Sequence, residues 1–473
     1  MKNLFQDTII APATIPGTGA ISIIRLSGKE TFCLVDEVVS LKRGSVSESD
    51  GYTIHYGSVY KSDGSFLDEV LVSVFRSPHS YTGEDSVEVS CHASSYIVSE
   101  IIKLFLHAGA RYAEPGEFTK RAFLNGKMDL AQAESVADVI SSSTSVSHRV
   151  AINQLRGGIS NKLSSLRAEL LEMCSLLELE LDFSEEDVEF AGRDKLSVLI
   201  LETIYKIDSL ADTYHKGNAI THGIHVAIAG PANAGKSTLL NALLNEDRAI
   251  VSEVAGTTRD TIEEVVNIGG LPFRFIDTAG LRKTEETVEK MGIERSYQKI
   301  SQADIVLFVL DLTSPESVLL TILEEFIPKL DSDSSHIILL LNKADLLSKN
   351  DYNKKVLAIN NFVLSIDNKI NIKIISAKEG KGIEELKSYL FEIEKDNIPE
   401  ENSTFVTNFR HFSALNEASS LLKRAYYSLS HNAPSDLIAE DLRLALNSLG
   451  SISGEVTSED ILHHIFMNHC IGK

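Results

Sequence analysis

The side chains of this sequence that are best suited to chemistry lie in a glycine-rich loop. Residues 230–237 read Gly-Pro-Ala-Asn-Ala-Gly-Lys-Ser, after the apolar run Ile224–Ala229 and before the helical pattern Ser237–Leu244. Between a strand and a helix, the backbone N–H groups of such a loop and the helix N-terminus converge on nucleotide phosphates. Lys236 would then bridge the β- and γ-phosphates, and Ser237 would ligate Mg²⁺. The loop therefore predicts a site for a nucleoside triphosphate.

Three further motifs follow in order, each at the end of an apolar run that predicts a strand. Residues 277–280 read Asp-Thr-Ala-Gly, where a carboxylate on the Mg²⁺ side and a glycine that senses the γ-phosphate belong. Residues 342–345 read Asn-Lys-Ala-Asp, and the Asp345 carboxylate can accept both N–H donors of a guanine edge, a pair that adenine lacks. In residues 376–378, Ser-Ala-Lys, a backbone amide can meet the guanine carbonyl. Because open α/β sheets bind ligands at the carboxyl ends of their strands, the predicted base is guanine.

The residues that would hydrolyse the nucleotide differ from those of Ras-like proteins. Leu281 follows the Asp-Thr-Ala-Gly motif, where Ras-like proteins carry the glutamine that orients the attacking water. An aliphatic side chain cannot orient water, so another group must do so. Residues 256–260 read Gly-Thr-Thr-Arg-Asp, a candidate switch in which Thr258 completes the Mg²⁺ shell. The nucleotide-binding residues predicted from these motifs are Asn233, Ala234, Gly235, Lys236, Ser237, Thr238, Gly256, Thr257, Thr258, Asp277, Thr278, Ala279, Gly280, Asn342, Lys343, Ala344, Asp345, Ser376, Ala377 and Lys378.

Together these motifs resemble the TrmE-Era-EngA group of P-loop GTPases. In that group an asparagine in the P-loop, here Asn233, accompanies activation by a potassium ion bound beside the phosphates. Such a cation lies where an arginine finger would offset the charge that develops in the transition state. The resemblance adds Ser252, Glu253, Val254 and Ala255 to the predicted nucleotide-binding residues. It implies potassium ligands from Asn233, from the backbone of Ser252 and Val254, and from Thr257.

The resemblance also implies a replacement for the missing glutamine. It assigns that role to Glu289, which lies in an acidic run whose residue chemistry alone does not single it out. Two alternatives to potassium remain open at this point. Asn233 could serve only to shape the loop, or Arg259 or Arg282 could act as an arginine finger in cis.

The elements that must position these motifs form a doubly wound α/β unit. Its strands are predicted as near-continuous apolar runs, as expected of parallel strands buried on both faces. The runs are Ile224–Ala229, Phe273–Ile276, Ile305–Leu310, Ile337–Leu341 and Ile372–Ile375.

Helical patterns lie on both sides of this unit. Before it, Ile159, Leu163, Leu166, Leu170, Cys174, Leu177 and Leu181 recur every three or four residues and predict a long amphipathic helix. After it, Leu415, Ala418, Leu421, Leu422 and Ala425 share one helical face, and a second helix is capped by Ser435 and stopped by Gly450. Each helical segment alone is too small to form a hydrophobic core of its own. We therefore expect the two segments to pack together, with the α/β unit inserted between them.

A chain of 473 residues is expected to hold about three domains. Residues 1–118 alternate β-rich runs such as Ile21–Leu26 and Thr53–Tyr60 with turn signals and a helix near Tyr96–Leu106, which predicts an α+β domain. The helical domain is predicted in two parts, 119–222 and 395–473, around an inserted domain at 223–394.

The bulk composition excludes some classes of protein. A formal net charge of −22 argues against a protein that coats nucleic acid through bulk positive charge. The four cysteines lie far apart, which suggests neither a zinc site nor a disulfide framework. The first residues lack the apolar core of a secretory signal, and no apolar run is long enough to span a bilayer, so we expect a cytoplasmic protein.

Over residues 1–473 the sequence resembles one family within that group, the tRNA-modification GTPases called MnmE or TrmE. The stretches that carry this resemblance lie in all three predicted regions. They are residues 80–85 (Ser-Tyr-Thr-Gly-Glu-Asp), 115–119 (Pro-Gly-Glu-Phe-Thr), 121–127 (Arg-Ala-Phe-Leu-Asn-Gly-Lys), 129–134 (Asp-Leu-Ala-Gln-Ala-Glu), 181–183 (Leu-Asp-Phe), 454–456 (Gly-Glu-Val) and the terminal Cys-Ile-Gly-Lys.

The family resemblance implies a folate-dependent reaction. It places Arg25, Glu88 and Lys127, with Lys473 from the tail, at contacts to a tetrahydrofolate derivative of the 5,10-methylene or formyl type. A pterin presents a guanine-like donor edge that suits a carboxylate, and its glutamate tail suits cations. Cys470 is a candidate nucleophile or general base, a role that requires a lowered thiol pKa.

The same resemblance implies the reaction and the partners. With an FAD-binding partner, glucose-inhibited division protein A (MnmG), a homodimer of the chain would install an aminomethyl-type group at C5 of the wobble uridine of certain tRNAs. GTP hydrolysis would drive the conformational cycle. The alternative is a regulatory or ribosome-assembly switch like Era, but assembly GTPases carry basic RNA-binding modules, whereas this chain has an acidic balance and a folate-like domain.

Overall fold

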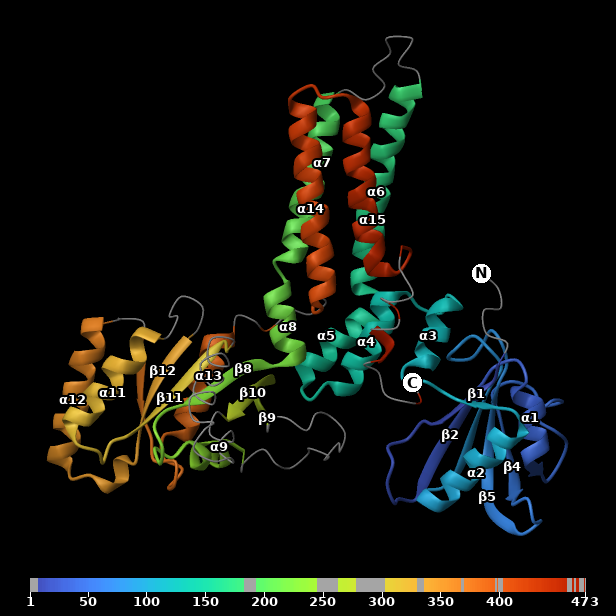
Figure 1. Cartoon of the computed structure of the whole chain (residues 1–473), viewed down its shortest axis with the longest axis horizontal. Helices are drawn as coiled ribbons and strands as arrows, with labels where there is room; N and C mark the ends of the chain where they lie inside the picture. Colours follow the sequence, from blue (N-terminus) through green and yellow to red (C-terminus); the bar gives the residue numbers. More distant parts are fainter. Residues whose placement is uncertain are drawn as a thin grey trace, which may run out of the picture. The chain divides into compact units, whose positions relative to one another are not determined.

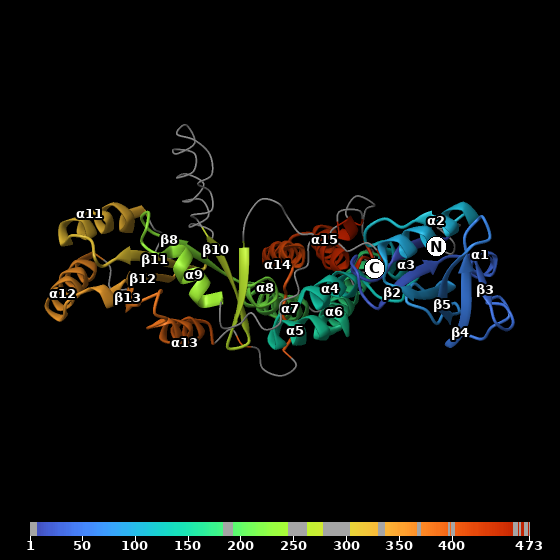
Figure 2. The ribbon, with the colours of Figure 1, turned by 90° about the horizontal axis from the view of Figure 1, so that it is seen from below.

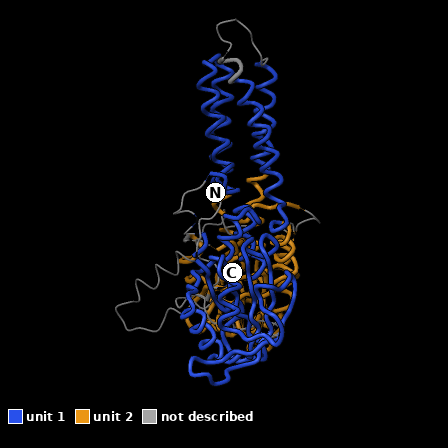
Figure 3. The backbone as a smooth tube through the Cα atoms, turned by 90° about the vertical axis from the view of Figure 1, so that its right-hand side faces the viewer, with its two compact units in different colours: residues 1–140, 154–209, 413–473 blue, residues 141–153, 210–412 orange. Residues whose placement is uncertain are grey.

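The computed structural model describes most of the chain, and contacts between residues divide it into two compact units (Figures 1 and 3). The described residues are 7–182, 193–244, 263–277, 303–329, 336–366, 370–395, 398, 403–456, 462, 465–467 and 472. Unit 1 comprises Met1–Ile140, Gln154–Ser209 and Ser413–Lys473, and unit 2 comprises Ser141–Asn153 and Leu210–Phe412. In the described residues no helix is both long enough and apolar enough to cross a bilayer.

Unit 1 contains a seven-stranded sheet in the order β3-β4-β5-β6-β2-β1-β7. Neighbouring strands are antiparallel except β1 and β7, which are parallel. The strands are β1 (Ile9–Pro12), β2 (Ile21–Ser27), β3 (Val39–Leu41), β4 (Thr53–Tyr60), β5 (Phe66–Phe75), β6 (Ser86–His92) and β7 (Arg111–Tyr112).

The two faces of this sheet differ because side chains alternate along each strand. Ile24 and Leu26 of β2 and Val87 of β6 are buried in a core shared with α1 (Thr31–Val38) and α2 (Ser95–Ala108). Arg25 and Glu88 therefore lie on the opposite face, away from these helices.

The helical part of unit 1 brings together segments that are far apart in the sequence. Four long helices, α6, α7, α14 and α15, run side by side (Figure 1). Ion pairs join them, as between Lys206 of α7 and Glu169 of α6 (2.7 Å) and between Lys423 of α14 and Asp208 of α7 (2.9 Å). The helices are α3 (Glu117–Leu124), α4 (Leu130–Ser141), α5 (Ser145–Leu155), α6 (Gly158–Asp182), α7 (Arg193–Ala211), α14 (Phe409–Ser430) and α15 (Ser435–Ser453), of which α5 runs from unit 2 into unit 1.

The predicted apolar stripe of α6 is buried as far as it is described. Ile159, Leu163, Leu166, Leu170, Cys174 and Leu177 are each at most 5% exposed. The side chain of Leu181 lies outside the described residues. The segments before and after the α/β unit thus share one helical core, which confirms the predicted discontinuous helical domain.

The predicted end of the last long helix is wrong. The sequence suggested that Gly450 stops it, but α15 continues to Ser453 and ends at Gly454, which adopts a left-handed conformation (φ 85°). Gly450 is buried, and a Cβ there would lie 3.4 Å from Val456 and 3.6 Å from Arg167 of α6. These are ordinary van der Waals distances, so Gly450 is an interior residue of the helix and neither its conformation nor its packing ends the helix. Most of the predicted helix Ser458–Asn468 lies outside the described residues.

Unit 2 contains a six-stranded sheet in the order β13-β12-β11-β8-β10-β9. Every neighbouring pair is parallel except the antiparallel β10 and β9. Its strands are β8 (Ile224–Ala229), β9 (Glu263–Ile268), β10 (Leu271–Asp277), β11 (Ile305–Asp311), β12 (His336–Asn342) and β13 (Asn371–Ile374). Its helices are α8 (Tyr214–His222), α9 (Lys236–Leu244), α11 (Glu316–Phe326), α12 (Lys349–Ile366) and α13 (Ile383–Glu394), with short 3-10 turns at Ile327–Lys329 and Ala344–Leu346.

Helices cover both faces of this sheet (Figure 2). Val226 and Ile228 of β8 pack in a core with α9 and α13. Ala227 and Ala229 of the same strand pack in a second core with α11 and α12. This double burial explains why the strands read as continuous apolar runs. The predicted fold classes, an α+β region, a discontinuous helical domain and an inserted α/β unit, are all confirmed.

Candidate functional site

The glycine-rich loop joins β8 to α9, as the sequence predicted. Lys236 is the first residue of α9, and its Nζ donates to the backbone carbonyls of Gly230 (2.9 Å) and Pro231 (2.8 Å). Ser237 and Thr238 follow in the first turn. The first N–H groups of a helix have no partner within the helix and carry a partial positive charge. The loop is therefore built to receive an anion beside a lysine.

Close packing requires glycine at two positions of the loop. Gly230 (φ 139°) lies against β11, and a Cβ there would be 2.2 Å from the Val309 carbonyl oxygen. A Cβ on Gly235 (φ 100°) would be 2.3 Å from Nδ2 of Asn342. Asn233 is exposed and left-handed (φ 61°), a conformation that asparagine tolerates better than most residues. The loop conformation thus requires the two glycines and suits an asparagine at residue 233.

Asn342 ties three of the predicted motifs together. It ends β12 and is 2% exposed. Its Nδ2 donates to the carbonyl of Ala234 (2.8 Å), and its Oδ1 accepts from the backbone N–H of Ala377 (3.0 Å). One buried amide thereby fixes the spacing of the phosphate loop, residues 342–345 and residues 376–378.

The base-recognition motif has a partner that sequence reasoning missed. Lys343 is left-handed (φ 64°), and its Nζ lies 2.6 Å from Oδ2 of Asp311, the last residue of β11. Burial acts to raise the pKa of Asp311, but hydrogen bonds from Lys343 and Thr313 lower it overall, so the carboxylate stays ionised. The sequence contains a signal for Asp311, because this residue ends an apolar run in the same way as the predicted site residues do. Asp345 is exposed, so its carboxylate is accessible to a ligand.

Other predicted nucleotide-site residues lie outside the described residues. Asp277 ends β10, but its side chain is not described. The residues outside the description are Ser252, Glu253, Val254, Ala255, Gly256, Thr257, Thr258, Thr278, Ala279, Gly280 and Glu289. The structure therefore brings together the phosphate loop and the base-recognition motifs. The switch, all the potassium ligands including Asn233, and the Mg²⁺ ligands Ser237 and Thr258 remain predictions.

A second group of predicted residues meets on the sheet of unit 1. Arg25 of β2 and Glu88 of β6 are directly opposite in the antiparallel register, and their closest ion-pair distance is 2.8 Å. The guanidinium carbon of Arg25 lies 5.5 Å from the centre of the Tyr81 ring and 5.7 Å from that of Phe118. Arg25 also donates to the carbonyl of Gly472 (3.3 Å), in the C-terminal tail.

The other predicted folate contacts are only partly placed. Lys127 donates to the carbonyl of Pro78 (2.9 Å), in the loop that also carries Tyr81. Cys470 and Lys473 lie outside the described residues. The aromatic neighbours Tyr81 and Phe118 were not predicted, although both lie in stretches that carried the family resemblance.

Comparison with known proteins decides the family. A family model described as "MnmE helical domain" matches residues 130–470, and one described as "GTP-binding protein TrmE N-terminus" matches residues 8–127. The chain is 46% identical over 470 residues to the tRNA modification GTPase MnmE of Bacteroides thetaiotaomicron, covering 99% of this chain and 100% of the relative. It belongs to the MnmE family. A MnmE of Flavobacterium johnsoniae is also 46% identical, over 474 residues and 99% of each chain.

A solved structure is similar over a smaller part of the chain. Aquifex aeolicus Era matches with 27% identity and a TM-score of 0.28, covering 42% of this chain and 66% of that one. Membership of the MnmE family, together with the phosphate loop and the guanine motifs, makes the chain a P-loop GTPase of tRNA modification. A GTPase of this family is expected to take GTP with Mg²⁺, and the relatives are named for the modification of tRNA.

Proposed function

We propose that this MnmE-family GTPase is stimulated by potassium and acts with an FAD-dependent partner of the MnmG type on the wobble uridine of certain tRNAs. The reaction attaches a (carboxymethyl)aminomethyl group to C5 of the base, with a folate one-carbon unit as the carbon source. The observation that supports the folate step is the Arg25–Glu88 pair, which meets the carbonyl of Gly472 on the face of the sheet away from α1 and α2. Gly472 stands in the sequence between the two proposed tail residues, Cys470 and Lys473.

The residues present fit a folate. Glu88 is 25% exposed and supplies a carboxylate for the donor edge of a pterin. Arg25 and Lys127 supply cations for the carboxylates of the glutamate tail. When bound, the folate would supply the one-carbon unit, and these side chains would hold and orient it.

The proposal includes a homodimer formed through this sheet. Register places Arg25 opposite Glu88, Glu88 opposite Ser73, and Ser73 opposite Ile54, so all four share one face. That face also carries exposed apolar side chains: Ile21 is 66% exposed, Ile54 68% and Leu71 47%. A second copy of the chain would bury these side chains beside the folate site.

Nucleoside analysis of bulk tRNA from cells that lack this gene tests the substrate. We expect the C5 substituent to be lost from the wobble uridine and to return when the gene is restored. An unchanged modification profile would leave the GTPase activity without this substrate.

The potassium requirement is tested on the purified protein. Potassium should raise GTP turnover well above the rate in sodium, and Asn233→Ala should abolish the difference. Equal rates in the two salts would exclude potassium stimulation.

Glu289→Ala should slow hydrolysis while leaving the affinity for GDP unchanged.

We further propose that the partner provides much of the tRNA contact. A net charge of −22 opposes strong attraction to a polyanion. The isolated protein should therefore bind tRNA weakly and with little dependence on salt. Tight, strongly salt-dependent binding by this chain alone would contradict the proposal.

A further inference from the structure

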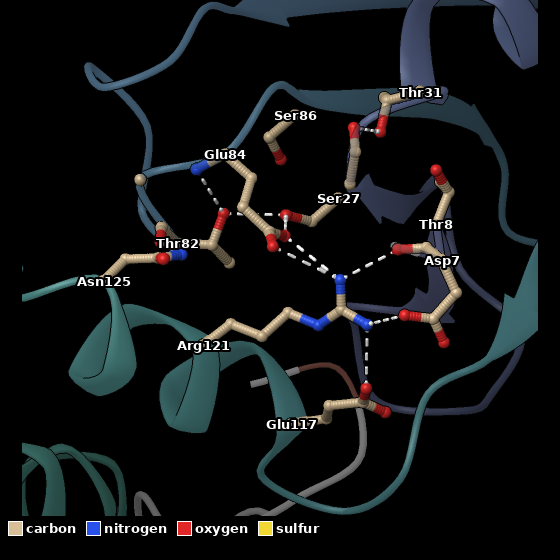
Figure 4. Close-up of polar contacts among 12 residues, drawn as sticks. Asp7, Thr8, Ser27, Thr31, Thr82, Glu84, Ser86, Glu117, Arg121 and Asn125 are labelled. Atoms are coloured by element: carbon tan, nitrogen blue, oxygen red, sulfur yellow. Dashed lines mark hydrogen bonds and ion pairs between the residues drawn. The ribbon is translucent and has the colours of Figure 1, made fainter. Parts of the chain in front are cut away.

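A fully buried arginine lies behind the proposed folate site. Arg121 of α3 is 0% exposed, and its guanidinium meets three carboxylates (Figure 4). Nη2 lies 2.8 Å from Asp7 and 3.0 Å from Glu117, and Nη1 lies 3.2 Å from Glu84. Nη1 also donates to the backbone carbonyl of Asp7 (3.0 Å).

A buried ion network of this kind is poorly explained by stability alone. Transferring an arginine and its partners out of water costs several kcal/mol per ion, and apolar replacements of similar volume are often equally stable. What the charges add is geometry, because a guanidinium with fixed donors sets the positions of several carboxylates at once. The three carboxylates here come from separate segments: Asp7 precedes β1, Glu84 lies between β5 and β6, and Glu117 begins α3.

Glu84 connects Arg121 to the loop between β5 and β6. It also accepts from the Ser27 hydroxyl of β2 (2.8 Å), and that hydroxyl is 2.7 Å from the Thr82 hydroxyl. The backbone carbonyl of Thr82 in turn accepts from Asn125, the residue that follows α3 (2.8 Å). The loop is thus held between β2 on one side and the α3 region on the other.

This loop carries the side chain that faces Arg25. The Tyr81 hydroxyl is 2.8 Å from the hydroxyl of Thr119 of α3, while the Tyr81 ring lies against the Arg25 guanidinium. Phe118, on the same helix, lies against Arg25 as well. The carbonyl of Pro78, at the start of the loop, accepts from Lys127. Any movement of the loop relative to α3 would therefore displace both Arg25 and Lys127.

We propose that Arg121 is a positioning residue of the folate site, which holds the Tyr81 loop against α3 through Glu84 and so fixes Arg25 and Lys127 for the ligand. This inference rests on the proposed folate function. Arg121 itself does not touch the ligand in this account. Its effect passes through Glu84, Thr82 and Tyr81.

The same network contains a matched control. Arg111 pairs with Asp7 (2.7 Å) and with Glu117 (2.5 Å), two of the three carboxylates that Arg121 meets, and no described contact joins it to Glu84. Removing either arginine deletes one positive charge beside the same carboxylates. Only the removal of Arg121 also breaks the link between α3 and Glu84 of the loop.

The test measures binding of 5-formyltetrahydrofolate to the full-length protein by calorimetry. Arg121→Met should weaken binding roughly tenfold or more, since small displacements of aligned groups have effects of this size. Arg121→Lys should restore part of the affinity, and Arg111→Met should bind within about twofold of the unchanged protein. In the modification assay Arg121→Met should raise the KM for folate while kcat at saturating folate is kept. Circular dichroism and the thermal unfolding of each variant check that unit 1, which contains Arg121, is folded.

A second variant covers the case in which Arg121→Met does not fold. Glu84→Gln keeps the arginine and the shape of the loop but removes the charge that joins them, and it should weaken folate binding in the same direction. Unchanged folate affinity in Arg121→Met would overturn the proposal. If that variant is unfolded, unchanged affinity in Glu84→Gln would overturn it. Equal losses of affinity in Arg121→Met and Arg111→Met would do so as well. If the unchanged protein does not bind 5-formyltetrahydrofolate, the folate function itself fails, which is a distinguishable result.

Discussion

At the scale of single residues, both sites depend on buried polar side chains that make contacts in more than one direction. Asn342 donates to the phosphate loop and accepts from Ala377, and Arg121 joins three segments around one guanidinium. Leaving one partner of such a contact buried and unmatched costs about 1–3 kcal/mol, which is why these groups fix positions more firmly than exposed pairs do.

Because carboxylates surround Arg121, the stability of the folded chain depends on pH. Glu117 is 4% exposed, and burial acts to raise its pKa, but hydrogen bonds from Arg111, the Glu114 backbone and Arg121 lower the pKa overall. A glutamate whose pKa is lower in the folded state stabilises that state at pH values above its unfolded pKa of about 4.3. This stabilisation is lost as the pH falls through the pKa that the group has in the folded state.

We therefore expect Glu117→Gln to lower the free energy of unfolding by about 1–3 kcal/mol near pH 7. The difference from the unchanged protein should shrink below about pH 4, where the native carboxyl also becomes protonated. Thermal unfolding of both proteins from about pH 3 to pH 7 measures this. A difference that stays constant over the whole range would show that the Glu117 charge contributes nothing.

At the scale of elements, the end of α15 gives a prediction about backbone conformation. Gly454 is left-handed, and a Cβ there would lie 2.7 Å from the Phe123 ring and 2.9 Å from Leu130. Gly454→Ala should lower stability by about 1–3 kcal/mol, from the strained conformation and the displaced ring. Gly44 is also left-handed (φ 67°), and a Cβ there would meet nothing within 4 Å, so Gly44→Ala reports the backbone cost alone. Equal melting temperatures for the two variants would contradict the packing argument.

Elements defined by local patterns could be predicted from the sequence. β8 has the predicted bounds because its residues are apolar on both faces, and the phosphate loop followed from residue types at fixed spacing. The end of α15 could not be predicted, because the sequence does not show whether a glycine ends a helix or packs inside it. The contacts of Asn342 and Tyr81 could not be predicted either, since they join residues more than 30 positions apart.

At the scale of the whole molecule, the proposed dimer can be tested by a substitution on the exposed sheet face of unit 1. Leu71 lies opposite Tyr56 and Ser90 on the face that carries Arg25. Leu71→Glu would place a charge in the proposed interface, where burial without a partner is costly. We expect it to convert the dimer to monomer in light scattering.

The control for the dimer test is an exposed leucine elsewhere. Leu357 of α12 is 61% exposed, and Leu357→Glu should leave the mass unchanged. A dimer that survives Leu71→Glu would place the interface on another surface.

Loops at one edge of the mainly parallel sheet of unit 2 hold a guanine nucleotide, and a substitution at Asp345 tests this most directly. Asp345→Asn removes an acceptor for the guanine N–H groups and should weaken GTP binding roughly a hundredfold. It should also improve binding of xanthosine triphosphate, whose base offers the complementary donor and acceptor. Titration of the unchanged protein and this variant with both nucleotides measures the exchange. We expect the preference to reverse, and an unaltered preference for GTP in Asp345→Asn would show that Asp345 does not read the base.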